Sequence, residues 1–554
     1  MASPAERSGG PGDAWDVVVV GSGGPGLTAA LAASARGAKV ALLEATPAIG
    51  GTTVFSGGQV WVPGHHRLSE LGVSDSREEA LAYLRASSPT RGGAHDEARW
   101  AAFVDAAPAM IRFLEERTPL RFLPNDYPDS FVELPGGKRG RNLEARPFRP
   151  GRLQGRRADL RKPCSINRTN LPVTWQELRR LVQNLVPEAI RLGPRVLYRL
   201  LSGSLTGSRA LVAGLYAGCL REGVEVILGA RARELLTSDG EVCGVVAERA
   251  GERVAWRARG GVILASGGFD WSPELKEKYL PGRLDHSAAV PSNRGDGLRM
   301  ALQVGAQLAH LDEAWYWPGF RNPGYFYQGA PLGSIVTSLR SYPHGVVVNR
   351  SGRRFGNEAG WNFGNELQAR DERTGERVNL PCWVILDAQF RRRYSAPEAG
   401  LFRFLPARSW VQKFASLDEL AGALGIDPTG LRETLERFNA NARQGRDPDF
   451  ARGESECDRF YGARRARHPN LGAVEQAPFY AVELVATAVG TKGGPLTTER
   501  GEVLRADGAP IPGLYAVGSV ADSILGVSVS GGDTLGPGLT AGYVAGNAAA
   551  LRAG

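Results

Sequence analysis

Short apolar runs alternate with a glycine turn and a small-residue stretch near the start of the chain. Residues 16–20 are an apolar run, residues 21–26 are glycine-rich, small residues fill 27–36, and a second apolar run spans 39–43. Apolar runs of this length are typical of strands that a parallel sheet buries on both faces. The pattern therefore predicts a strand, a tight turn, a helix and a second strand, which together form one βαβ unit.

Two later segments repeat the strand-and-glycine pattern. Residues 261–265 form an apolar run that ends in the glycine turn 266–268, and residues 515–519 form another run that also reaches a glycine. A glycine-rich stretch at 531–538 then opens an Ala/Gly-rich helix. We expect these segments to return the chain to the first βαβ unit.

The pattern changes character between residues 311 and 477. Aromatic residues cluster at 315–327, and helical periodicity appears at 417–424 and 428–443. We therefore expect an α/β fold, with a Rossmann-like domain formed by residues 1–310 and 478–554. An α+β substrate (cap) domain at 311–477 would be inserted between its two parts.

The first βαβ unit has the residues of a dinucleotide-binding fingerprint. Gly21 permits a tight turn, Gly23 lets the backbone approach a pyrophosphate, and Gly26 lets the helix pack close to the strand. The helix start offers N–H groups to phosphates. Glu44 ends the second strand, where it can accept hydrogen bonds from a ribose diol and repel a 2′-phosphate. The alternative is a glycine-rich turn in another kind of α/β domain.

Further glycine and hydroxyl clusters follow Glu44 directly. They span residues 49–53 and 56–58, and a Gly-Asp-Gly turn at 295–297 opens another predicted helix. These clusters suggest a ligand that extends past the first βαβ unit.

The composition is that of a globular protein. The chain has 554 residues, of which 42% are hydrophobic and 23% charged, so two or three domains are expected. Its five cysteines are odd in number and scattered, which argues against a disulfide framework or a zinc site and favours a reducing compartment. We find neither a signal-peptide pattern nor an apolar run near 18 residues. These features predict a cytoplasmic protein.

The net charge of +9 is concentrated in one segment. Residues 138–162 hold ten basic residues against two acidic ones. This basic loop is either solvated or contacts an anionic surface, such as the inner face of a membrane. Residues 175–201 show an amphipathic pattern that suits either a bilayer surface or the protein's own core. Few aromatic residues are interleaved with the basic ones, so we expect no nucleic-acid partner.

Several stretches, in order, resemble the family of FAD-dependent 3-ketosteroid Δ1-dehydrogenases and fumarate reductases. They include GGTT…SGGQVWVP, ASGGFDWSPELKEKYL, NRGDGLRMALQVGA and VVVNRSGRRFGNEA. The resemblance implies FAD, held non-covalently because residues 50–58 contain no histidine. The cofactor-binding residues that we expect are Gly21, Gly23, Gly24, Gly26, Glu44, Gly51, Thr52, Thr53, Ser56, Gly57, Gly58, Ala232, Ser266, Gly267, Gly268, Asp296, Gly518 and Leu535.

The resemblance also implies a reaction. In this family, hydrogen-bond donors hold a carbonyl, a base removes a proton from the α-carbon, and the β-carbon gives hydride to the flavin. The expected partners are a hydrophobic, polycyclic, ketone-bearing substrate and an external electron acceptor. The aromatic cluster at 315–327 would line the substrate site or belong to the core of the second domain.

The residues expected to perform this chemistry depart from the family pattern. After Asn357-Glu358-Ala359 the family tyrosine is missing, and Asn362 or Trp361 stands in that region. Ser528 or Ser530 replaces a second tyrosine, and a third is lost beside Tyr127. The remaining candidates for catalysis are Tyr127, Asn362, Ser528, Ser530 and Asp533. Tyr127 is either a base or loop packing, and Asp533 is either a base or the N-cap of the last helix.

Three functions therefore stay open. The first is a 3-ketosteroid Δ1-dehydrogenase-like oxidoreductase acting on a CH–CH bond next to a carbonyl. The second is a related dehydrogenase or ene-reductase that acts on a non-steroid secondary metabolite. The third is a flavin-binding paralogue without turnover. Reduction of small dicarboxylates is disfavoured because the arginine and histidine motifs that it needs are absent.

Overall fold

A mostly parallel sheet carries the βαβ unit at its centre. The computed structural model describes residues 7–8, 15–162, 171–322, 324–396, 398, 401 and 406–554. The strand order of the first sheet is β22-β23-β10-β2-β3-β7, and β1, β8 and β9 extend it. Its strands are β1 (Arg7–Ser8), β2 (Trp15–Val20), β3 (Val40–Glu44), β7 (Glu225–Leu228), β8 (Ala230–Ser238), β9 (Glu241–Arg249), β10 (Glu252–Leu264), β22 (Glu502–Leu504) and β23 (Pro510–Ala516). The predicted unit of two parallel strands around a helix is confirmed, because β2 pairs with β3 in parallel.

Strand β10 joins two predicted elements. Strand β9 pairs in antiparallel fashion with the first half of β10, and β10 then continues into the buried run predicted at 261–265. Its second half pairs in parallel with β2 and β23. The turn at 266–268 therefore leaves the sheet at the same edge as the turn at 21–26.

Small residues let two helices pack closely against this sheet. Helix α14 (Leu535–Ala553) lies along α1 (Gly24–Ser34). A Cβ added at Gly542 would lie 2.3 Å from the Pro25 carbonyl oxygen, and one at Gly546 would lie 2.3 Å from that of Ala29. The Ala/Gly-rich composition of the last helix is thus a packing requirement.

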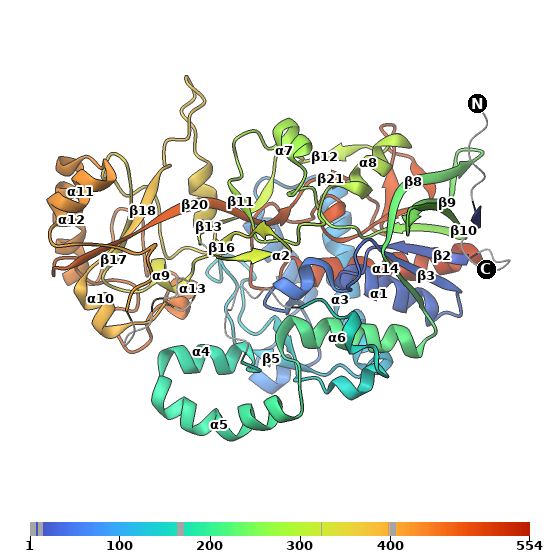
Figure 1. Cartoon of the computed structure of the whole chain (residues 1–554), viewed down its shortest axis with the longest axis horizontal. Coiled ribbons are helices and arrows are strands. Elements are labelled where there is room, and N and C mark those ends of the chain that lie inside the picture. The colour runs from blue at the N-terminus through green and yellow to red at the C-terminus, as the bar shows by residue number, and fades with distance from the viewer. Residues whose placement is uncertain are drawn as a thin grey trace.

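A second sheet lies at the opposite end of the molecule from the two termini (Figure 1). Its strand order is β16-β13-β20-β18-β17, with β11 and β19 also paired to β20. The strands are β11 (His286–Ser287), β13 (Ala314–Phe320), β16 (Ser334–Ile335), β17 (Gly345–Asn349), β18 (Cys382–Leu386), β19 (Gln412–Phe414) and β20 (Phe479–Thr491). The helices of this region are α9 (Ser338–Ser341), α10 (Ala388–Arg393), α11 (Leu417–Leu424), α12 (Pro428–Arg443) and α13 (Glu456–Tyr461). Strands β11 and β20 come from outside 311–477, and the domain bounds stay a prediction.

Smaller elements connect the two sheets. A three-stranded sheet contains β4 (Gln59–Trp61), β5 (Phe122–Asn125) and β6 (Asn142–Ala145), and two-stranded pairs join β12 (Leu308–Ala309) to β21 (Gly494–Pro495) and β14 (Phe326–Tyr327) to β15 (Ala330–Pro331). The other helices are α2 (Arg77–Ser87), α3 (Ala94–Arg117), α4 (Trp175–Gln183), α5 (Leu185–Leu201), α6 (Gly207–Arg221), α7 (Pro273–Tyr279) and α8 (Asp296–Gln303). Helices α4 and α5 form a pair along the lower side in Figure 1. In the described part of the chain, no helix is long and apolar enough to cross a membrane.

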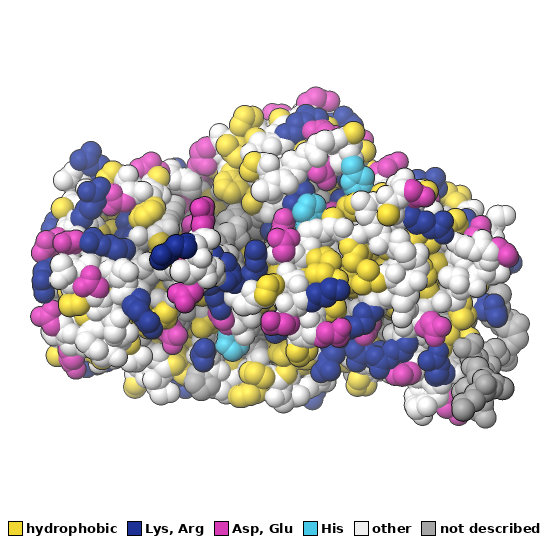
Figure 2. Space-filling model, turned by 90° about the horizontal axis from the view of Figure 1, so that it is seen from above, with side chains coloured by type: hydrophobic (Ala, Val, Ile, Leu, Met, Phe, Trp, Pro, Cys, Tyr) yellow, Lys and Arg dark blue, Asp and Glu magenta, His cyan; other side chains and the backbone are white. Residues whose placement is uncertain are grey.

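The basic loop at 138–162 is less solvated than its composition suggests. Residues 142–145 form β6, and Arg141 is buried between the carboxylates of Asp75 and Asp129. Arg161 is also buried and donates to the Thr46 hydroxyl and the Ala48 carbonyl. On the face in Figure 2, basic and acidic side chains are interspersed over the surface.

Candidate active site

A cavity of about 580 Å³ runs from the glycine turns of the first sheet to a group of aromatic side chains. We call its first part the glycine end. It is lined by the turn after β2, by Glu44, by the 3-10 turn Gly51–Phe55 and by residues 265–267 and 517–519. We call the other part the aromatic end. Its lining includes Tyr127, Arg179, Trp317, Trp361, Phe460 and Tyr461.

Backbone contacts fix the turn that opens the glycine end. Gly21 has a φ of +109°, and a Cβ at Gly26 would lie 2.0 Å from the Gly21 carbonyl oxygen. Neither position accepts a larger residue without moving the backbone. The Gly24 N–H donates to the Thr53 hydroxyl at 2.9 Å. The turn thus brings the N-terminus of α1 against the cavity, where its dipole favours an anionic group.

Glu44 stands at the end of β3 and lines the cavity. Its Oε2 accepts from the Ser22 N–H and hydroxyl, and its Oε1 accepts from the Thr46 N–H and hydroxyl. Arg161 lies 3.8 Å from the same carboxylate. These contacts orient a buried acceptor beside the glycine turn, in the position that a ribose diol requires.

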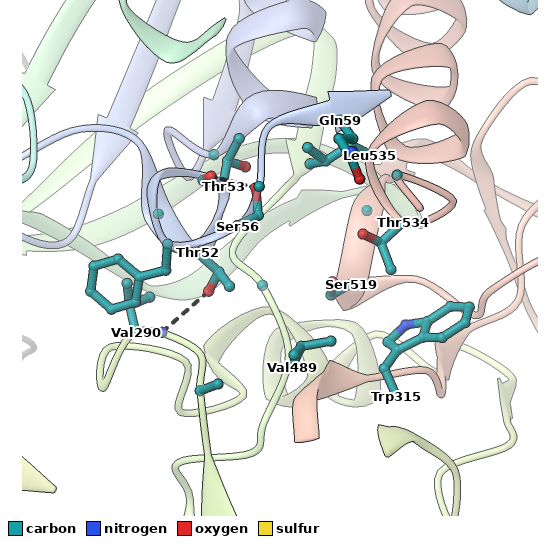
Figure 3. A pocket seen from close by; sticks show the side chains of 18 of the residues that line it. Thr52, Thr53, Ser56, Gln59, Val290, Trp315, Val489, Ser519, Thr534 and Leu535 are labelled. Carbon is teal, nitrogen blue, oxygen red and sulfur yellow. Dashed lines mark hydrogen bonds between the residues drawn. The ribbon is translucent and has the colours of Figure 1, made fainter. Parts of the chain in front are cut away.

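Hydroxyl groups also line the cavity, among them those of Thr52, Thr53 and Ser56 (Figure 3). The Thr52 hydroxyl accepts from the Val290 N–H at 3.3 Å, drawn as a dashed line, and from the Asn293 amide at 3.2 Å. The Ser266 hydroxyl is buried and finds no hydrogen-bond partner among the described residues. Such an unsatisfied buried hydroxyl suits a polar ligand. The glycine end therefore fits a dinucleotide in its donors, acceptors and close backbone approach.

Most of the predicted cofactor residues line this cavity. They are Gly21, Gly23, Glu44, Gly51, Thr52, Thr53, Ser56, Gly57, Ala232, Ser266, Gly267, Asp296, Gly518 and Leu535. Four others lie behind the wall and shape it: Gly24, Gly26, Gly58 and Gly268 are packed against neighbouring atoms. At Gly58, for example, a Cβ would lie 2.2 Å from the Ser208 backbone nitrogen.

A hydrogen-bonded cluster connects the two ends of the cavity. The Trp361 indole N–H donates to the Ser528 hydroxyl at 2.7 Å, and that hydroxyl donates to Asp533 Oδ2 at 2.7 Å. The N–H groups of Val529 and Ser530 also donate to Asp533 Oδ2. Asn362 exchanges two hydrogen bonds with the Ser528 backbone. The structure therefore brings together four of the five catalytic candidates, all except Tyr127.

Asp533 braces the loop at 528–530 and does not cap the last helix. The N-cap of α14 is Thr534, and no side chain accepts from that helix terminus. Burial raises the pKa of Asp533 to about 6, although the hydrogen bonds from Ser528, Val529 and Ser530 oppose this rise. The carboxyl group is therefore mostly ionised at neutral pH while lining the cavity. The Ser528 hydroxyl is engaged on both sides, which leaves it poorly placed to donate to a substrate.

Aromatic rings form the walls of the other end. The centroids of Tyr127 and Phe460 are 4.8 Å apart, and those of Trp361 and Tyr461 are 4.7 Å apart. Trp317 packs edge-on against Trp361 at 4.8 Å. Burial raises the pKa values of Tyr127 and Tyr461 above their ordinary value, so both hydroxyls stay protonated. This end suits a flat apolar molecule that carries a polar oxygen.

Of the aromatic cluster at 315–327, only part reaches the cavity. Trp315 and Trp317 line it, whereas Tyr327 packs edge-on against Phe55 at 4.9 Å. The cluster is therefore divided between the cavity wall and the core of the first domain, against which Tyr327 packs.

The sequence did not single out three important lining residues: Arg179, Phe460 and Tyr461. Phe460 and Tyr461 are the last two residues of α13, and Arg179 lies on α4. Nothing in their local pattern distinguishes them from core or surface positions, because only the tertiary fold brings α4 and α13 to the cavity.

A network of buried charges holds the loop that carries Trp361. Arg354 forms ion pairs with Glu358 and Asp447, both at 2.7 Å. Arg340 is buried and donates to the carbonyls of Val336, Glu358 and Gly360. The loop that carries Trp361 and Asn362 is thus firmly held beside the cavity.

Comparisons with known proteins agree with this geometry. The model of the FAD binding domain family matches residues 16–535. The chain is 38% identical to a 4-oxocyclohexanecarboxylate 2-dehydrogenase of Sinomonas cyclohexanicum, covering 98% of this chain and 94% of that protein. It is 36% identical to a 3-oxosteroid 1-dehydrogenase of Mycolicibacterium smegmatis, covering 98% and 99%.

A solved structure shares the whole architecture. The crystal structure of a 3-ketosteroid Δ1-dehydrogenase from Sterolibacterium denitrificans, in complex with 1,4-androstadiene-3,17-dione, matches with a TM-score of 0.89. The identity is 32%, over 97% of this chain and 99% of that one. The predicted fold class and the predicted cofactor, FAD, are confirmed. The chain belongs to the FAD binding domain family, among the flavoprotein oxidoreductases that include the 3-oxosteroid 1-dehydrogenases.

Proposed function

We propose that this protein forms a carbon–carbon double bond next to the carbonyl of a cyclic ketone. The observation that carries the proposal is a single cavity that joins the glycine end to an aromatic end beside Asp533. FAD, when bound, supplies the acceptor for the hydride that leaves the substrate's β-carbon. The substrate also loses its α-proton, so each turnover removes two electrons and two protons and needs an external electron acceptor.

Asp533 is the group we propose to accept the α-proton. A base works best when its pKa lies near the working pH, and the pKa of Asp533 is about 6. Every hydrogen bond found for its carboxylate within the described part of the chain reaches Oδ2, so Oδ1 is left to receive a proton. Tyr127 and Tyr461 remain protonated, so we assign them to donate hydrogen bonds to the ketone oxygen.

Ser528 and Asn362 position this base. Ser528 donates to Asp533, and Asn362 fixes the Ser528 backbone from the loop that also carries Trp361. Ser530 contributes its N–H to the same carboxylate. Ser528, Asn362 and Ser530 thus support Asp533. In this proposal Asp533 takes the place of a tyrosinate base.

Anaerobic mixing with ketones tests the reaction. The relatives act, by name, on 3-oxosteroids and on 4-oxocyclohexanecarboxylate, so androst-4-ene-3,17-dione and 4-oxocyclohexanecarboxylate are the first probes. Loss of the flavin absorbance near 450 nm with either ketone, and formation of the conjugated enone or dienone, is the expected result. A yellow protein that no cyclic ketone bleaches, and whose chemically reduced form no enone reoxidises, would instead be a flavin-binding paralogue. Reoxidation by an enone alone would make it an ene-reductase.

We propose that the flavin is held without a covalent bond. Among the described residues that line the cavity there is neither histidine nor cysteine, the side chains that most often link to flavins. Acid precipitation should release all of the yellow colour into the supernatant, and colour retained in the pellet would contradict this.

We also propose that helices α4 and α5 bring the protein to an anionic membrane surface on its cytoplasmic side. Several large apolar side chains of α5 are exposed, including Ile190 at 75% and Leu201 at 80%. Arginines lie between them along the helix. Sedimentation with anionic vesicles should retain the protein, and replacing Ile190 and Leu201 by serine should release it. Equal sedimentation of both forms would contradict the contact.

A further inference from the structure

Among the described residues, one charged side chain at the aromatic end forms no ion pair. Arg179, on α4, lines the cavity, and its guanidinium carbon lies 3.2 Å from the centre of the Phe460 ring. One guanidinium nitrogen donates to the Phe460 carbonyl at 2.9 Å. Throughout the described part of the chain, no carboxylate forms an ion pair with Arg179. Arg408, which also lines the cavity, is exposed to solvent instead.

Three buried arginines elsewhere in the molecule are satisfied in a different way. Arg141 lies between two carboxylates, and Arg354 pairs with Glu358 and Asp447. Arg340 has no such pair but donates to three backbone carbonyls. Arg179 donates to a single carbonyl among the described residues, so most of its five N–H groups find no acceptor in that part of the chain.

The groups around Arg179 increase this imbalance. Its titratable neighbours are Tyr127, Tyr342 and Tyr461, which are neutral, and Arg464, which is also positive. Burial lowers the pKa of Arg179 to about 10, so the guanidinium is still charged at neutral pH. A partly buried charge without an opposite charge is costly, and an anion that enters the cavity would offset this cost.

We infer that Arg179 binds a carboxylate of the substrate, so that the natural substrate is an oxo acid and not a neutral ketone. This inference rests on the proposed function. A guanidinium binds a carboxylate through two parallel hydrogen bonds, which fixes both position and orientation. Tyr461 lies close enough to both Arg179 and Asp533 for each charge to act on its pKa, and all three residues line the cavity. A substrate held by its carboxylate at Arg179 would extend past Tyr461 toward the proton-accepting side chain.

The consequence is selectivity for charge. A neutral ketone would leave the guanidinium unpaired in an apolar chamber, whereas an oxo acid would satisfy it. Sites built for a polar group reject analogues that lack the group far more strongly than apolar pockets reject a change in size. We expect the kcat/KM for an oxo acid to exceed that for its methyl ester by at least roughly 100-fold.

We call the proposed carboxylate binding by Arg179 the anchor. Two pairs of probes, one small and one large, test it. The small pair is 4-oxocyclohexanecarboxylate and its methyl ester, and the large pair is a four-ring 3-ketone with a side-chain carboxylate and its methyl ester. Binding alone is measured with cyclohexanecarboxylate, which has no ketone to react, through the change in the flavin spectrum of the holoenzyme. The variants are Arg179→Gln and Arg179→Lys. Arg180→Gln is the matched control, because Arg180 is the exposed neighbour on the same helix.

The expected pattern is specific to the guanidinium. Arg179→Gln should weaken binding of the carboxylate probe and raise the KM for the oxo acid by roughly 30-fold or more, with little change for the methyl ester. Arg179→Lys should lie between Arg179→Gln and the wild type, and Arg180→Gln should match the wild type. Flavin content and melting temperature report whether each variant is folded.

Failure of the anchor and failure of the proposed function give different results. If ketones bleach the flavin but neither size of probe shows a preference for the acid, or Arg179→Gln binds both forms as the wild type does, the anchor is wrong and the dehydrogenase proposal stands. If cyclohexanecarboxylate binds through Arg179 but no ketone bleaches the flavin, the anchor stands and the dehydrogenase proposal fails. No binding of any carboxylate probe by the wild type would overturn the anchor.

Discussion

The two ends of the cavity are built by different means. At the glycine end, backbone contacts within and between neighbouring strands and turns set the shape, as at Gly21 and Gly26. At the aromatic end, side chains from separate segments meet, among them Tyr127, Arg179 and Asp533. The first end is therefore a property of local geometry, and the second is a property of the assembled fold. Substitutions at each end of the cavity should therefore have different effects.

Filling the space beneath the first turn should remove the cofactor itself. In Gly26→Ala the new Cβ would lie 2.0 Å from the Gly21 carbonyl oxygen, a backbone atom that cannot swing aside. We expect flavin content, measured as the ratio of absorbance at 450 and 280 nm, to fall at least about tenfold, since the α1 terminus can no longer approach the pyrophosphate.

The matched control is Gly92→Ala. An added Cβ at Gly92 meets nothing within 4 Å, so flavin content should not change. If Gly26→Ala bound flavin as well as Gly92→Ala does, the claim that the backbone sets the glycine end would be wrong.

Removing the proposed base should abolish catalysis and leave the glycine end intact. Asp533→Asn keeps an oxygen that can accept hydrogen bonds from the loop at 528–530 but has no basic group. We expect kcat/KM to fall by roughly 10²–10⁴-fold with full flavin content, measured by anaerobic single-turnover reduction. Activity near that of the wild type would show that Asp533 only braces the loop.

A smaller and more specific effect should follow from Ser528→Ala. The hydrogen bond from Ser528 lowers the pKa of Asp533, so its loss should raise that pKa above about 6. Because the base must be ionised, the acid limb of the pH profile of kcat/KM should move to higher pH, while the rate at pH 9 changes little. An unmoved acid limb would argue that another group titrates.

The smallest effect concerns stability near α4. Glu144 accepts a hydrogen bond from the Trp175 N–H at 2.6 Å, and burial raises its pKa to about 8. A carboxyl group whose folded-state pKa is raised binds its proton more tightly when folded, so its contribution to stability is present below about pH 4.5 and is lost as pH rises toward about 8. Chemical denaturation at pH 6 and pH 9 should show a fall in the free energy of unfolding that is smaller in Glu144→Gln. The same pH dependence in both proteins would exclude this residue as the cause.

The contrast between the two ends also explains what the sequence could predict. The βαβ unit, the return at 266–268 and most of the cofactor residues follow from short patterns, because a glycine turn needs particular residues at particular spacings. Arg179, Phe460 and Tyr461 could not be predicted in this way. They occupy ordinary helical positions, and the cavity forms around them only when α4 and α13 pack beside the loop of Trp361.

Asp533 illustrates an intermediate case. Because it stands just before the last helix, the sequence predicts that Asp533 is either a base or the N-cap of that helix, and both alternatives place it at a turn. Thr534 occupies the N-cap position, and the Asp533 carboxylate instead accepts hydrogen bonds from the loop at 528–530. The local sequence predicts the turn but not the direction of the Asp533 side chain. That direction depends on Ser528 and on the indole of Trp361.

Helix α4 has one more consequence, which concerns how such enzymes diversify. A capping box at Thr174 and Glu177 starts the helix, and within its first two turns it presents Trp175, Leu178 and Arg179 to the cavity. Exchanging Leu178 or Arg179 would alter the choice of substrate and leave the glycine turns in place, whereas the Trp175 indole donates to the Gly57 carbonyl at 2.7 Å and also shapes the flavin site. New substrate specificities can therefore evolve through substitutions in a single short helix. The same few codons can be randomised in protein engineering.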